Sequence, residues 1–442
     1  MMVRMRMTVI GTGYLGATHA ACMAELGHEV LGVDVDENKI SRLKNSEVPF
    51  YEPGLPEVLQ RNIEAGRLDF TTDYARAAEF ANVHFIGVGT PQQRGSYAAD
   101  TRYVEAVIDD LVPQLQGDHL ILGKSTVPVG TAAALQERAD NLAQPGASVE
   151  IAWNPEFLRE GYAVKDTIEP DRIVLGTRGR DSRAGEIARQ VYATPLGSGT
   201  PFIVTDLQTA ELVKVSANAF LATKISFINA VSEVCEIVGA DVTQLADAIG
   251  YDDRIGRKFL GAGLGFGGGC LPKDIRAFMA RAGEVGADQA LTFLREVDAI
   301  NMRRRQRVVD IAREELGSLI GRRVTVLGAA FKPNSDDVRD SPALAVAGQL
   351  SLAGADVRVY DPEAMDNARR VFPTLDYAAS LDDALSGAEL VILATEWQVF
   401  REMDPVAVGR GVDRRVLIDG RNVLDLEAWQ AAGWTVRALG RG

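Results

Sequence analysis

The segment Arg6–Gly16, with the sequence RMTVIGTGYLG, is the part of the chain that decides the fold. Its first half is a short apolar run, which predicts a β-strand. The pattern G-x-G-x-x-G follows at once, with its glycines at Gly11, Gly13 and Gly16. Glycines directly after a strand let the backbone turn sharply and approach a pyrophosphate closely. The segment therefore predicts the start of a dinucleotide-binding β-α-β unit.

The residues that follow complete this unit. Helical periodicity runs from Tyr14 to Leu26, and the segment 28–34 predicts a second strand that ends in Asp34, 18 residues after Gly16. A pyrophosphate at the helix N-terminus and an acidic side chain on the ribose hydroxyls are what this arrangement provides. Because a carboxylate repels a 2′-phosphate, the sequence favours NAD over NADP as the cofactor.

Strands and helices continue to alternate, which predicts a doubly wound parallel sheet. The further strands are expected at 68–72, 83–88, 119–123, 148–152 and 172–175. Ligands of such sheets bind outside the carboxyl ends of the strands. The loops 89–91, 124–128 and 154–161 are therefore candidate binding loops, and we expect a Rossmann-type NAD-binding domain over residues 1–205.

The alternation stops at Asp206, and an α-helical middle domain with a long connecting helix is expected over 206–305. Within a helical stretch from Thr209 to Gly239, Lys214 and Asn218 share one helix face. We interpret the arginine-rich run 301–307 as a solvated helix face. Strands expected at 323–328, 356–360, 390–394 and 415–419 then predict a C-terminal Rossmann-like α/β domain over 306–442. In that domain Ser341 and Pro342 predict a helix start.

A glycine-rich loop precedes a cysteine in the middle of the chain. Six glycines occupy positions 261–269, followed by Cys270 and, four residues later, Asp274. Such a loop suits a backbone that presses against a ligand, and a thiol near cations is a candidate nucleophile. The alternative is a structural turn with a buried cysteine. The other two cysteines, Cys22 and Cys235, have the pattern of core residues on helices.

The composition excludes several classes of protein. The chain has 442 residues, which predicts two or three domains, and 46% hydrophobic and 24% charged residues. A net charge of −14 argues against nucleic acid and anionic membranes as partners. Neither a signal peptide nor a membrane span is expected, and we predict a cytoplasmic protein. Three cysteines and four histidines without ligand spacing predict no metal site.

Taken together, the motifs resemble the nucleotide-sugar 6-dehydrogenases, the UDP-glucose/GDP-mannose dehydrogenase family. The resemblance covers nearly the whole chain, and its most specific parts are the cysteine loop 265–274 and the Lys214/Asn218 helix. Two departures are Gly269, where many members have serine, and the loop 94–100, where the family commonly has an Asp-Gly pair.

The resemblance implies oxidation of the C6 alcohol of UDP-glucose to a carboxylate with two NAD. It implies that Lys214 and Asn218 stabilise the developing alkoxide and that Cys270 captures the aldehyde as a thiohemiacetal, which a second oxidation converts to a thioester. Asp274 would position the hydrolytic water. The resemblance also implies that Glu156, with Thr126 holding a water, acts as a general base. It leaves open which step Glu156 serves and which step Asp274 serves.

The resemblance also implies the binding residues. On the cofactor side these are Gly11, Gly13, Tyr14, Leu15, Gly16, Asp34, Lys39, Thr90, Pro91, Thr126, Glu160, Lys273 and Arg339. On the substrate side they are Glu156, Phe157, Leu158, Arg159, Glu160, Lys214, Asn218, Arg254, Gly261, Ala262, Gly263, Leu264, Gly265, Phe266, Gly267, Phe331, Lys332 and Arg421. A homodimer is expected through the middle helices. GDP-mannose or a UDP-N-acetyl sugar as substrate, and an NAD-binding regulator without catalysis, are the alternatives.

Overall fold

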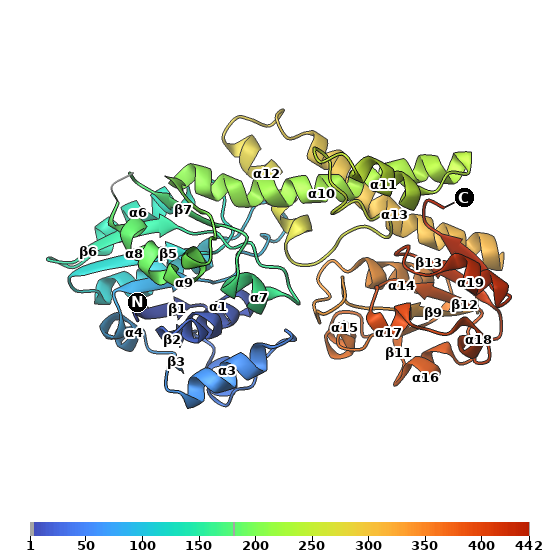
Figure 1. Ribbon diagram of the computed structural model, residues 1–442, viewed down its shortest axis with the longest axis horizontal. Helices are drawn as coiled ribbons and strands as arrows, with labels where there is room; N and C mark the ends of the chain where they lie inside the picture. Colours follow the sequence, from blue (N-terminus) through green and yellow to red (C-terminus); the bar gives the residue numbers. More distant parts are fainter. Residues whose placement is uncertain (1–3, 180–181, 442) are drawn as a thin grey trace. The chain divides into compact units, whose positions relative to one another are not determined.

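The computed structural model describes residues 4–179 and 182–441, and the chain forms two compact units. Unit 1 comprises Met1–Ala217 and Ala280–Gly286, and unit 2 comprises Asn218–Met279 and Ala287–Gly442. Figure 1 shows a sheet covered by helices in each unit, in blue to green near the N-terminus and in orange to red near the C-terminus. The fold class is therefore α/β, as the alternation of strands and helices predicts.

The sheet of unit 1 has eight strands, in the order β3-β2-β1-β4-β5-β6-β7-β8. The strands are β1 (Arg6–Ile10), β2 (Glu29–Val33), β3 (Leu68–Thr71), β4 (Val83–Ile86), β5 (Asp118–Gly123), β6 (Ser148–Trp153), β7 (Ile173–Thr177) and β8 (Phe202–Asp206). The central strand β1 pairs in parallel with both neighbours, so that Thr8 lies opposite Leu31 and His84. All five strands expected after the first two are present.

The end of this sheet departs from the all-parallel prediction. β6 and β7 meet in an antiparallel contact between Trp153 and Gly176, and β8 then runs parallel to β7. The connection from β6 to β7 contains only the six-residue helix α7 (Ala163–Ile168), which packs on α1. The chain thus re-enters the sheet at the same end of the strands at which it left. As a result, β7 and β8 run antiparallel to the first six strands.

Helices cover both faces of this sheet, as a doubly wound fold requires. They are α1 (Tyr14–Glu25), α2 (Glu37–Lys44), α3 (Leu55–Glu64), α4 (Tyr74–Phe80), α5 (Arg102–Leu111), the 3-10 helix η1 (Val112–Gln114), α6 (Thr131–Leu142), α7, α8 (Arg183–Val191) and α9 (Ala193–Gly197). One apolar cluster joins the sheet to α1, α3 and α8, and a second joins it to α4, α5 and α6.

The middle of the chain is helical, as predicted. Its helices are α10 (Leu207–Val238), α11 (Val242–Gly250), α12 (Leu271–Glu284) and α13 (Phe293–Leu316). The 32-residue helix α10 contains both Lys214, in unit 1, and Asn218, in unit 2. Among the described helices, none combines the length and the apolar character needed to cross a membrane.

The sheet of unit 2 has six parallel strands, in the order β11-β10-β9-β12-β13-β14. The strands are β9 (Arg323–Leu327), β10 (Asp356–Tyr360), β11 (Asp376–Tyr377), β12 (Leu390–Leu393), β13 (Val416–Asp419) and β14 (Thr435–Ala438). The helices of this domain are α14 (Pro342–Leu352), α15 (Met365–Val371), α16 (Leu381–Leu385), α17 (Gln398–Arg401), α18 (Pro405–Val408) and α19 (Leu426–Ala431). Ser341 caps α14 with Pro342 at its first position, as expected.

The interpretation of residues 301–307 as a solvated face is wrong for two of the four arginines in this run, whereas Arg303 is exposed as expected. The side chains of Arg304 and Arg305 are 1% and 3% exposed. Arg304 pairs with Glu236 at 2.9 Å, and Arg305 pairs with Asp340 at 2.9 Å. Buried guanidinium groups are tolerated because these carboxylates compensate their charge. A run of arginines in a sequence does not reveal which members have such partners.

The remaining cysteines and histidines have the structural roles expected of them. Cys22 and Cys235 are buried, and burial raises the pKa of the Cys22 thiol to about 12. His84 and His119 stack on each other, with a hydrogen-bond distance of 3.0 Å between their rings.

Candidate active site

The three glycines of the turn between β1 and α1 have different surroundings, and the backbone of the turn itself requires two of them. A Cβ at Gly11, whose φ is +88°, would lie 2.5 Å from Val88, and one at Gly16 would lie 1.7 Å from the carbonyl oxygen of Gly11. At Gly13 the same atom would meet nothing within 4 Å. Gly13 also begins α1 without a side-chain cap, which leaves the first amides of the helix available to an anion.

Asp34 directly follows β2, and its carboxylate binds the amide of Thr12 in this turn. Its carboxylate accepts hydrogen bonds from the amide of Thr12 at 2.7 Å, from the amide of Asp36 at 3.1 Å and from Nζ of Lys39 at 2.8 Å. Burial alone would raise the pKa of Asp34, but the bonds from Lys39, Asp36 and Thr12 outweigh it and lower the pKa. Asp34 is therefore a fixed anion at the place where a ribose is bound in such folds.

A cleft of about 490 Å³ extends over this turn. Its lining includes Gly11, Gly13, Asp34, Lys39, Val88, Pro91 and Tyr103. The open space outside Gly13, the uncapped helix and the ionised carboxylate match the phosphates and the ribose of a dinucleotide, so the residues present fit NAD. Thr90 and Thr126 lie together at the end of the neighbouring strands, where the Thr90 hydroxyl donates to the carbonyl of Thr126 at 2.6 Å.

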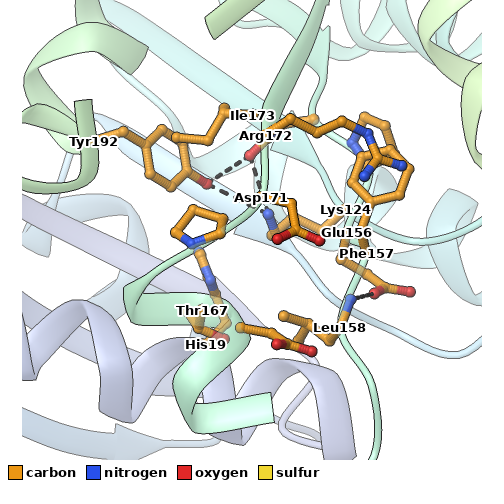
Figure 2. A pocket seen from close by; sticks show the side chains of 14 residues that line it. His19, Lys124, Glu156, Phe157, Leu158, Thr167, Asp171, Arg172, Ile173 and Tyr192 are labelled. Carbon is orange, nitrogen blue, oxygen red and sulfur yellow. Dashed lines mark hydrogen bonds between the residues drawn. The ribbon is translucent and has the colours of Figure 1, made fainter. Parts of the chain in front are cut away.

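Lys214 and Glu156 form an ion pair in unit 1. Nζ of Lys214 lies 2.9 Å from Oε1 of Glu156, with the two side chains 6% and 12% exposed. The other carboxylate oxygen accepts the amide of Leu158 at 2.6 Å, which fixes the acid within its loop. The ring of Phe157 lies between two cations, with Nζ of Lys214 at 5.6 Å and the guanidinium of Arg172 at 3.8 Å. Figure 2 shows Glu156, Phe157 and Arg172 together at this cavity.

A different lysine, Lys124, lines the cavity that Glu156, Phe157 and Arg172 also line, and the sequence gave it no role beyond its place in the candidate loop 124–128. Lys124 is buried and donates to Oδ1 of Asn154 at 3.1 Å and to the hydroxyl of Tyr192 at 3.3 Å (Figure 2). Burial lowers the pKa of Lys124 to about 8, although Glu156 opposes the shift. His19 lines the cavity as well, and burial lowers the pKa of its imidazole well below its ordinary value.

Asn218 and Asp274 meet in unit 2 beside the cysteine. Nδ2 of Asn218 donates to Oδ2 of Asp274 at 2.6 Å, and Nζ of Lys273 lies 2.5 Å from the other carboxylate oxygen. Asp274 is 1% exposed. Cys270 directly precedes α12, and its thiol is exposed, so the alternative of a structural turn with a buried cysteine is wrong.

The glycine loop in front of Cys270 is held by polar side chains. Asn301, which is fully buried, accepts the amide of Phe266 at 2.8 Å and donates to its carbonyl at 2.9 Å. Asn229 accepts the amide of Gly263 at 2.8 Å. At position 269 this chain has glycine where many members of the family have serine. A Cβ at this position would lie 2.2 Å from Cζ of Arg339. The guanidinium of Arg339 thus occupies the volume of the missing side chain.

Among the predicted substrate residues of unit 2, the glycine loop, Phe331, Lys332 and Arg421 form one group. Arg421, which follows β13, donates to the carbonyls of Ala394 at 2.7 Å and Gly265 at 2.9 Å, and burial lowers the pKa of its guanidinium. Leu264 donates its amide to the carbonyl of Gly420 at 2.9 Å. Nζ of Lys332 lies 5.4 Å above the ring of Phe331. These contacts join the glycine loop to the carboxyl end of the second sheet.

Two further predicted substrate residues, Arg254 and Arg159, form partly exposed ion pairs. Arg254 is exposed and pairs with Asp252, and Arg159 pairs with Asp166. Lys273 and Arg339 belong to unit 2, whereas the dinucleotide turn belongs to unit 1, so their role toward NAD stays a prediction. Within residues 4–179 and 182–441, no three histidine, cysteine, aspartate or glutamate side chains gather as a metal site would require.

Sequence reasoning missed Glu52, Lys124 as a cavity residue, and Asn301. Glu52 is 2% exposed and accepts hydrogen bonds from Tyr14, Gly161 and Ala163. An acid directly before Pro53-Gly54, a turn signal, is the one local hint of a fixed position. Lys124 and Asn301 carry no local signal of burial.

A dinucleotide turn, a buried lysine–glutamate pair and an exposed thiol together define a dinucleotide-dependent dehydrogenase. Comparison with known proteins then gives the family. The models that match describe the UDP-glucose/GDP-mannose dehydrogenase family: its NAD-binding domain over residues 5–195, its central domain over 208–303 and its UDP-binding domain over 325–426. The chain belongs to this family, and its cofactor is NAD.

Individual relatives agree over the full length. The chain is 42% identical to a UDP-glucose 6-dehydrogenase of Rhizobium meliloti, covering 99% of this chain and 100% of that protein. It is 41% identical to a UDP-glucose 6-dehydrogenase of Bacillus subtilis, covering 99% and 93%. The solved UDP-glucose dehydrogenase of Pyrobaculum islandicum is 38% identical, with a TM-score of 0.89 over 98% of this chain and 99% of that one.

Proposed function

We propose that the protein oxidises the C6 alcohol of UDP-glucose to the carboxylate of UDP-glucuronate with two NAD. The observation that carries the proposal is the exposed thiol of Cys270, which directly precedes the helix that carries Asp274 bound to Asn218. A thiol is needed only if an aldehyde must be held for a second oxidation. The names of the relatives supply the substrate, UDP-glucose.

The first oxidation removes a proton from the alcohol and a hydride from C6. NAD, when bound, accepts the hydride in each of the two oxidations. Glu156, alone or through a water held with Thr126, takes the proton, while Lys214 stabilises the negative charge that develops on the oxygen. The ion pair between Lys214 and Glu156 supports this division, because it keeps a cation and a base within one hydrogen bond of each other. Asn218 is the second donor to the developing alkoxide.

Cys270 then adds to the aldehyde. A bond forms between its sulfur and C6, and the carbonyl oxygen takes up a proton to give a thiohemiacetal. Loss of a second hydride and of the hydroxyl proton converts this intermediate to a thioester. Water attacks the thioester carbon, the carbon–sulfur bond breaks, and the thiol is restored as the carboxylate leaves. Asp274, buried and held by Asn218 and Lys273, is the acid that positions this water.

The sugar nucleotide contacts the two groups of predicted residues. The loop 156–160 and the glycine loop 261–267 bind the sugar, and Phe331, Lys332 and Arg421 bind the nucleotide. Arg421 supports this role, because it keeps a buried cation at the carboxyl end of a parallel sheet, where such sheets bind ligands. Lys273 and Arg339 are proposed to serve NAD, and Arg254 is proposed to reach a neighbouring subunit.

We also propose a homodimer formed through α10. Phe220, Phe227 and Val234 repeat every seven residues on this helix, and their exposed fractions are 66%, 53% and 58%. An apolar stripe with this repeat is typical of a helix that packs against another helix. Phe227→Glu should convert the dimer to a monomer in light scattering after size exclusion. Leu352→Glu, at an isolated apolar residue that is 91% exposed, is the control and should leave the dimer intact.

A reducing compartment is implied by the same chemistry. Cys270 must be a thiol at the start of each cycle, and thiols persist in the cytosol. We therefore propose that the protein acts in the cytoplasm.

The test of the function is stoichiometry. With limiting UDP-glucose the protein should form two NADH per sugar and release UDP-glucuronate. Cys270→Ser should abolish acid formation, while Cys22→Ala, at a buried thiol, should retain it. One NADH per sugar with free aldehyde released by the wild-type protein would refute the proposal.

Faster turnover of GDP-mannose or of a UDP-N-acetyl sugar than of UDP-glucose would show that this other sugar nucleotide is the substrate of the same mechanism. A solved UDP-N-acetylmannosamine dehydrogenase of Pyrococcus horikoshii, 25% identical with a TM-score of 0.86 over 99% of this chain and 100% of that one, makes this comparison necessary.

A further inference from the structure

Glu52 is a buried carboxylate that the proposed mechanism does not use. It lies between α2 and α3 and is 2% exposed. Oε2 accepts hydrogen bonds from the hydroxyl of Tyr14 and from the amide of Gly161 at 2.6 Å, and Oε1 accepts the amide of Ala163 at 2.7 Å. Burying an acid is costly unless its oxygens are satisfied, and these three donors satisfy both oxygens. Glu52 is therefore held in one position by three donors from two segments of unit 1.

The donors come from two functional parts of unit 1. Tyr14 is the first residue of α1 and follows Gly13 of the dinucleotide turn directly. Its ring packs on Phe50 at 5.0 Å, so the hydroxyl has a defined position. Gly161, with a φ of +78°, ends the loop that carries Glu156, and Ala163 opens α7. One carboxylate thus bonds to the cofactor turn at one side and to the end of the substrate loop at the other.

The direction of the Tyr14 bond is fixed. Burial, followed by the hydrogen bond to Glu52 and the charges of Glu52 and Glu160, raises the pKa of Tyr14 above its ordinary value. The phenol is therefore a donor throughout the neutral range. The same hydroxyl also accepts the amide of Gly161 at 3.3 Å. Loss of the hydroxyl therefore removes its bond to Glu52 and this longer bond to the loop, and it leaves the bonds from Gly161 and Ala163 to Glu52 in place.

We propose that Glu52 is a positioning residue that, with Tyr14, fixes the loop 154–161 relative to the dinucleotide turn. The consequence is that a change on the cofactor side of this bond alters binding on the substrate side. This inference rests on the proposed function for the identity of the two ligands, and on the hydrogen bonds alone for the connection itself.

Steady-state kinetics test the connection through effects on the opposite ligand. Tyr14→Phe keeps the ring and removes one hydroxyl, and it should raise the KM for UDP-glucose about fivefold although Tyr14 belongs to the cofactor turn. Glu52→Gln presents an NH2 group to at least one of the donors and should raise the KM for both ligands and lower kcat about tenfold. Tyr377→Phe and Glu25→Gln, which also remove or weaken side-chain hydrogen bonds, are the controls and should leave both KM values unchanged.

The double variant sharpens the test. Both changes alter the bond between Tyr14 and Glu52, and the only other bond that Tyr14→Phe removes is the 3.3 Å bond from the amide of Gly161. Tyr14→Phe in the Glu52→Gln background should therefore add less than twofold to either KM. A Tyr14→Phe effect confined to the KM for NAD, or effects that multiply in the double variant, would overturn the proposal. If Glu52→Gln does not fold, Glu52→Asp and Tyr14→Phe carry the test.

Hydrogen exchange gives a readout that does not depend on turnover. Addition of NADH to the wild-type protein should slow amide exchange in residues 156–163, and this protection should be lost in Tyr14→Phe. Equal protection in both proteins would overturn the proposal even if UDP-glucose is oxidised as expected. Protection that is lost in Tyr14→Phe while no nucleotide sugar is oxidised would uphold the connection and refute the proposed function.

Discussion

The two sheets of the molecule use one strand arrangement for two different purposes. In each, the central strand is followed by a glycine with positive φ, Gly11 at +88° after β1 and Gly328 at +117° after β9, and the next strand in the chain is followed by an aspartate, Asp34 or Asp361. Each aspartate accepts a backbone amide from the turn after the central strand, as Thr12 donates to Asp34 and Ala329 to Asp361. The correspondence indicates that both sheets carry the same local device.

The difference lies in what else each carboxylate binds. Asp34 lines an open cleft beside Lys39. Asp361 is 1% exposed and also accepts the indole of Trp397 at 3.0 Å and the amides of Glu363 and Ala364. All of its capacity is used within the protein. An aspartate at this position can bind a ligand when it stays accessible, as Asp34 does. It stabilises the protein when donors of the protein occupy all of its acceptor sites, as they do at Asp361.

The largest expected effect is at Asp361. Asp361→Ala would leave the indole of Trp397 and four backbone amides without their acceptor, which should lower the free energy of unfolding by about 3–5 kcal/mol. Denaturant unfolding of unit 2 measures this effect. Asp366→Ala, at a surface pair with Arg369, is the control and should change the free energy by less than about 0.5 kcal/mol. If Asp361→Ala lowered the affinity for NAD but not the free energy of unfolding, the contrast between Asp361 and Asp34 would be refuted.

The next effect concerns the buried cations of the two units. Burial lowers the pKa of Lys124 from its ordinary value of 10.5 to about 8, whereas the buried Arg304 has a carboxylate partner, Glu236, at 2.9 Å. Below about pH 8 Lys124 is charged in both states, and its burial costs stability. Between about pH 8 and 10.5 the folded state has lost this proton and the unfolded state has not, so the cost disappears as the pH rises. The gain is about 3 kcal/mol.

The difference between two proteins isolates this contribution. Lys124→Met should remove the part of the rise in unfolding free energy that belongs to Lys124, so that the wild-type curve minus the variant curve climbs from pH 8 to 10.5. Unfolding in urea at a series of pH values measures both curves. A flat difference over this range would show that the ammonium is not desolvated.

A smaller effect is expected at Asp34. Asp34→Asn keeps the shape of the side chain but removes the anion that faces the ribose, so the Kd for NAD should rise about 10–100-fold, equivalent to about 1.4–2.7 kcal/mol. The preference for NAD over NADP should narrow as well, because the repulsion of a 2′-phosphate is gone. Fluorescence titration with NADH and NADPH measures both. Asp69→Asn, at an exposed pair with Arg76, should change neither.

The smallest effect contrasts the two helix starts. The Ser341 hydroxyl accepts the amide of Leu344 and donates to the carbonyl of Ala329, so Ser341→Ala should cost about 1–2 kcal/mol of stability. Gly13→Ala, at the uncapped start of α1, meets open space and should leave stability within about 0.5 kcal/mol while weakening NAD binding. Thermal unfolding and NADH titration of the two variants distinguish a helix start that serves the fold from one that serves a ligand.

Much of this organisation could be predicted from the sequence because its signals are local. The glycines, the strand before them and Asp34 lie within one short segment, and Cys270 is marked by its loop. Glu52 could not be found in this way, since its amide partners lie 109 and 111 residues away. Arg304 was misread for a related reason: helical periodicity places a residue on a face but does not reveal a carboxylate on another element. The reversed strand β7 likewise depends on how the chain returns to the sheet.

The two hydrogen bonds from Asn301 to the glycine loop affect the affinity of any ligand that contacts the loop. Six glycines within residues 261–269 give this loop many accessible conformations in the unfolded chain, and restricting them is a large entropic cost of folding. Asn301 binds both the N–H and the C=O of Phe266, and Asn229 accepts the amide of Gly263, so part of that restriction is in place before any ligand binds. The loop is therefore preorganised at these positions. A sugar that contacts them loses no binding free energy to ordering them.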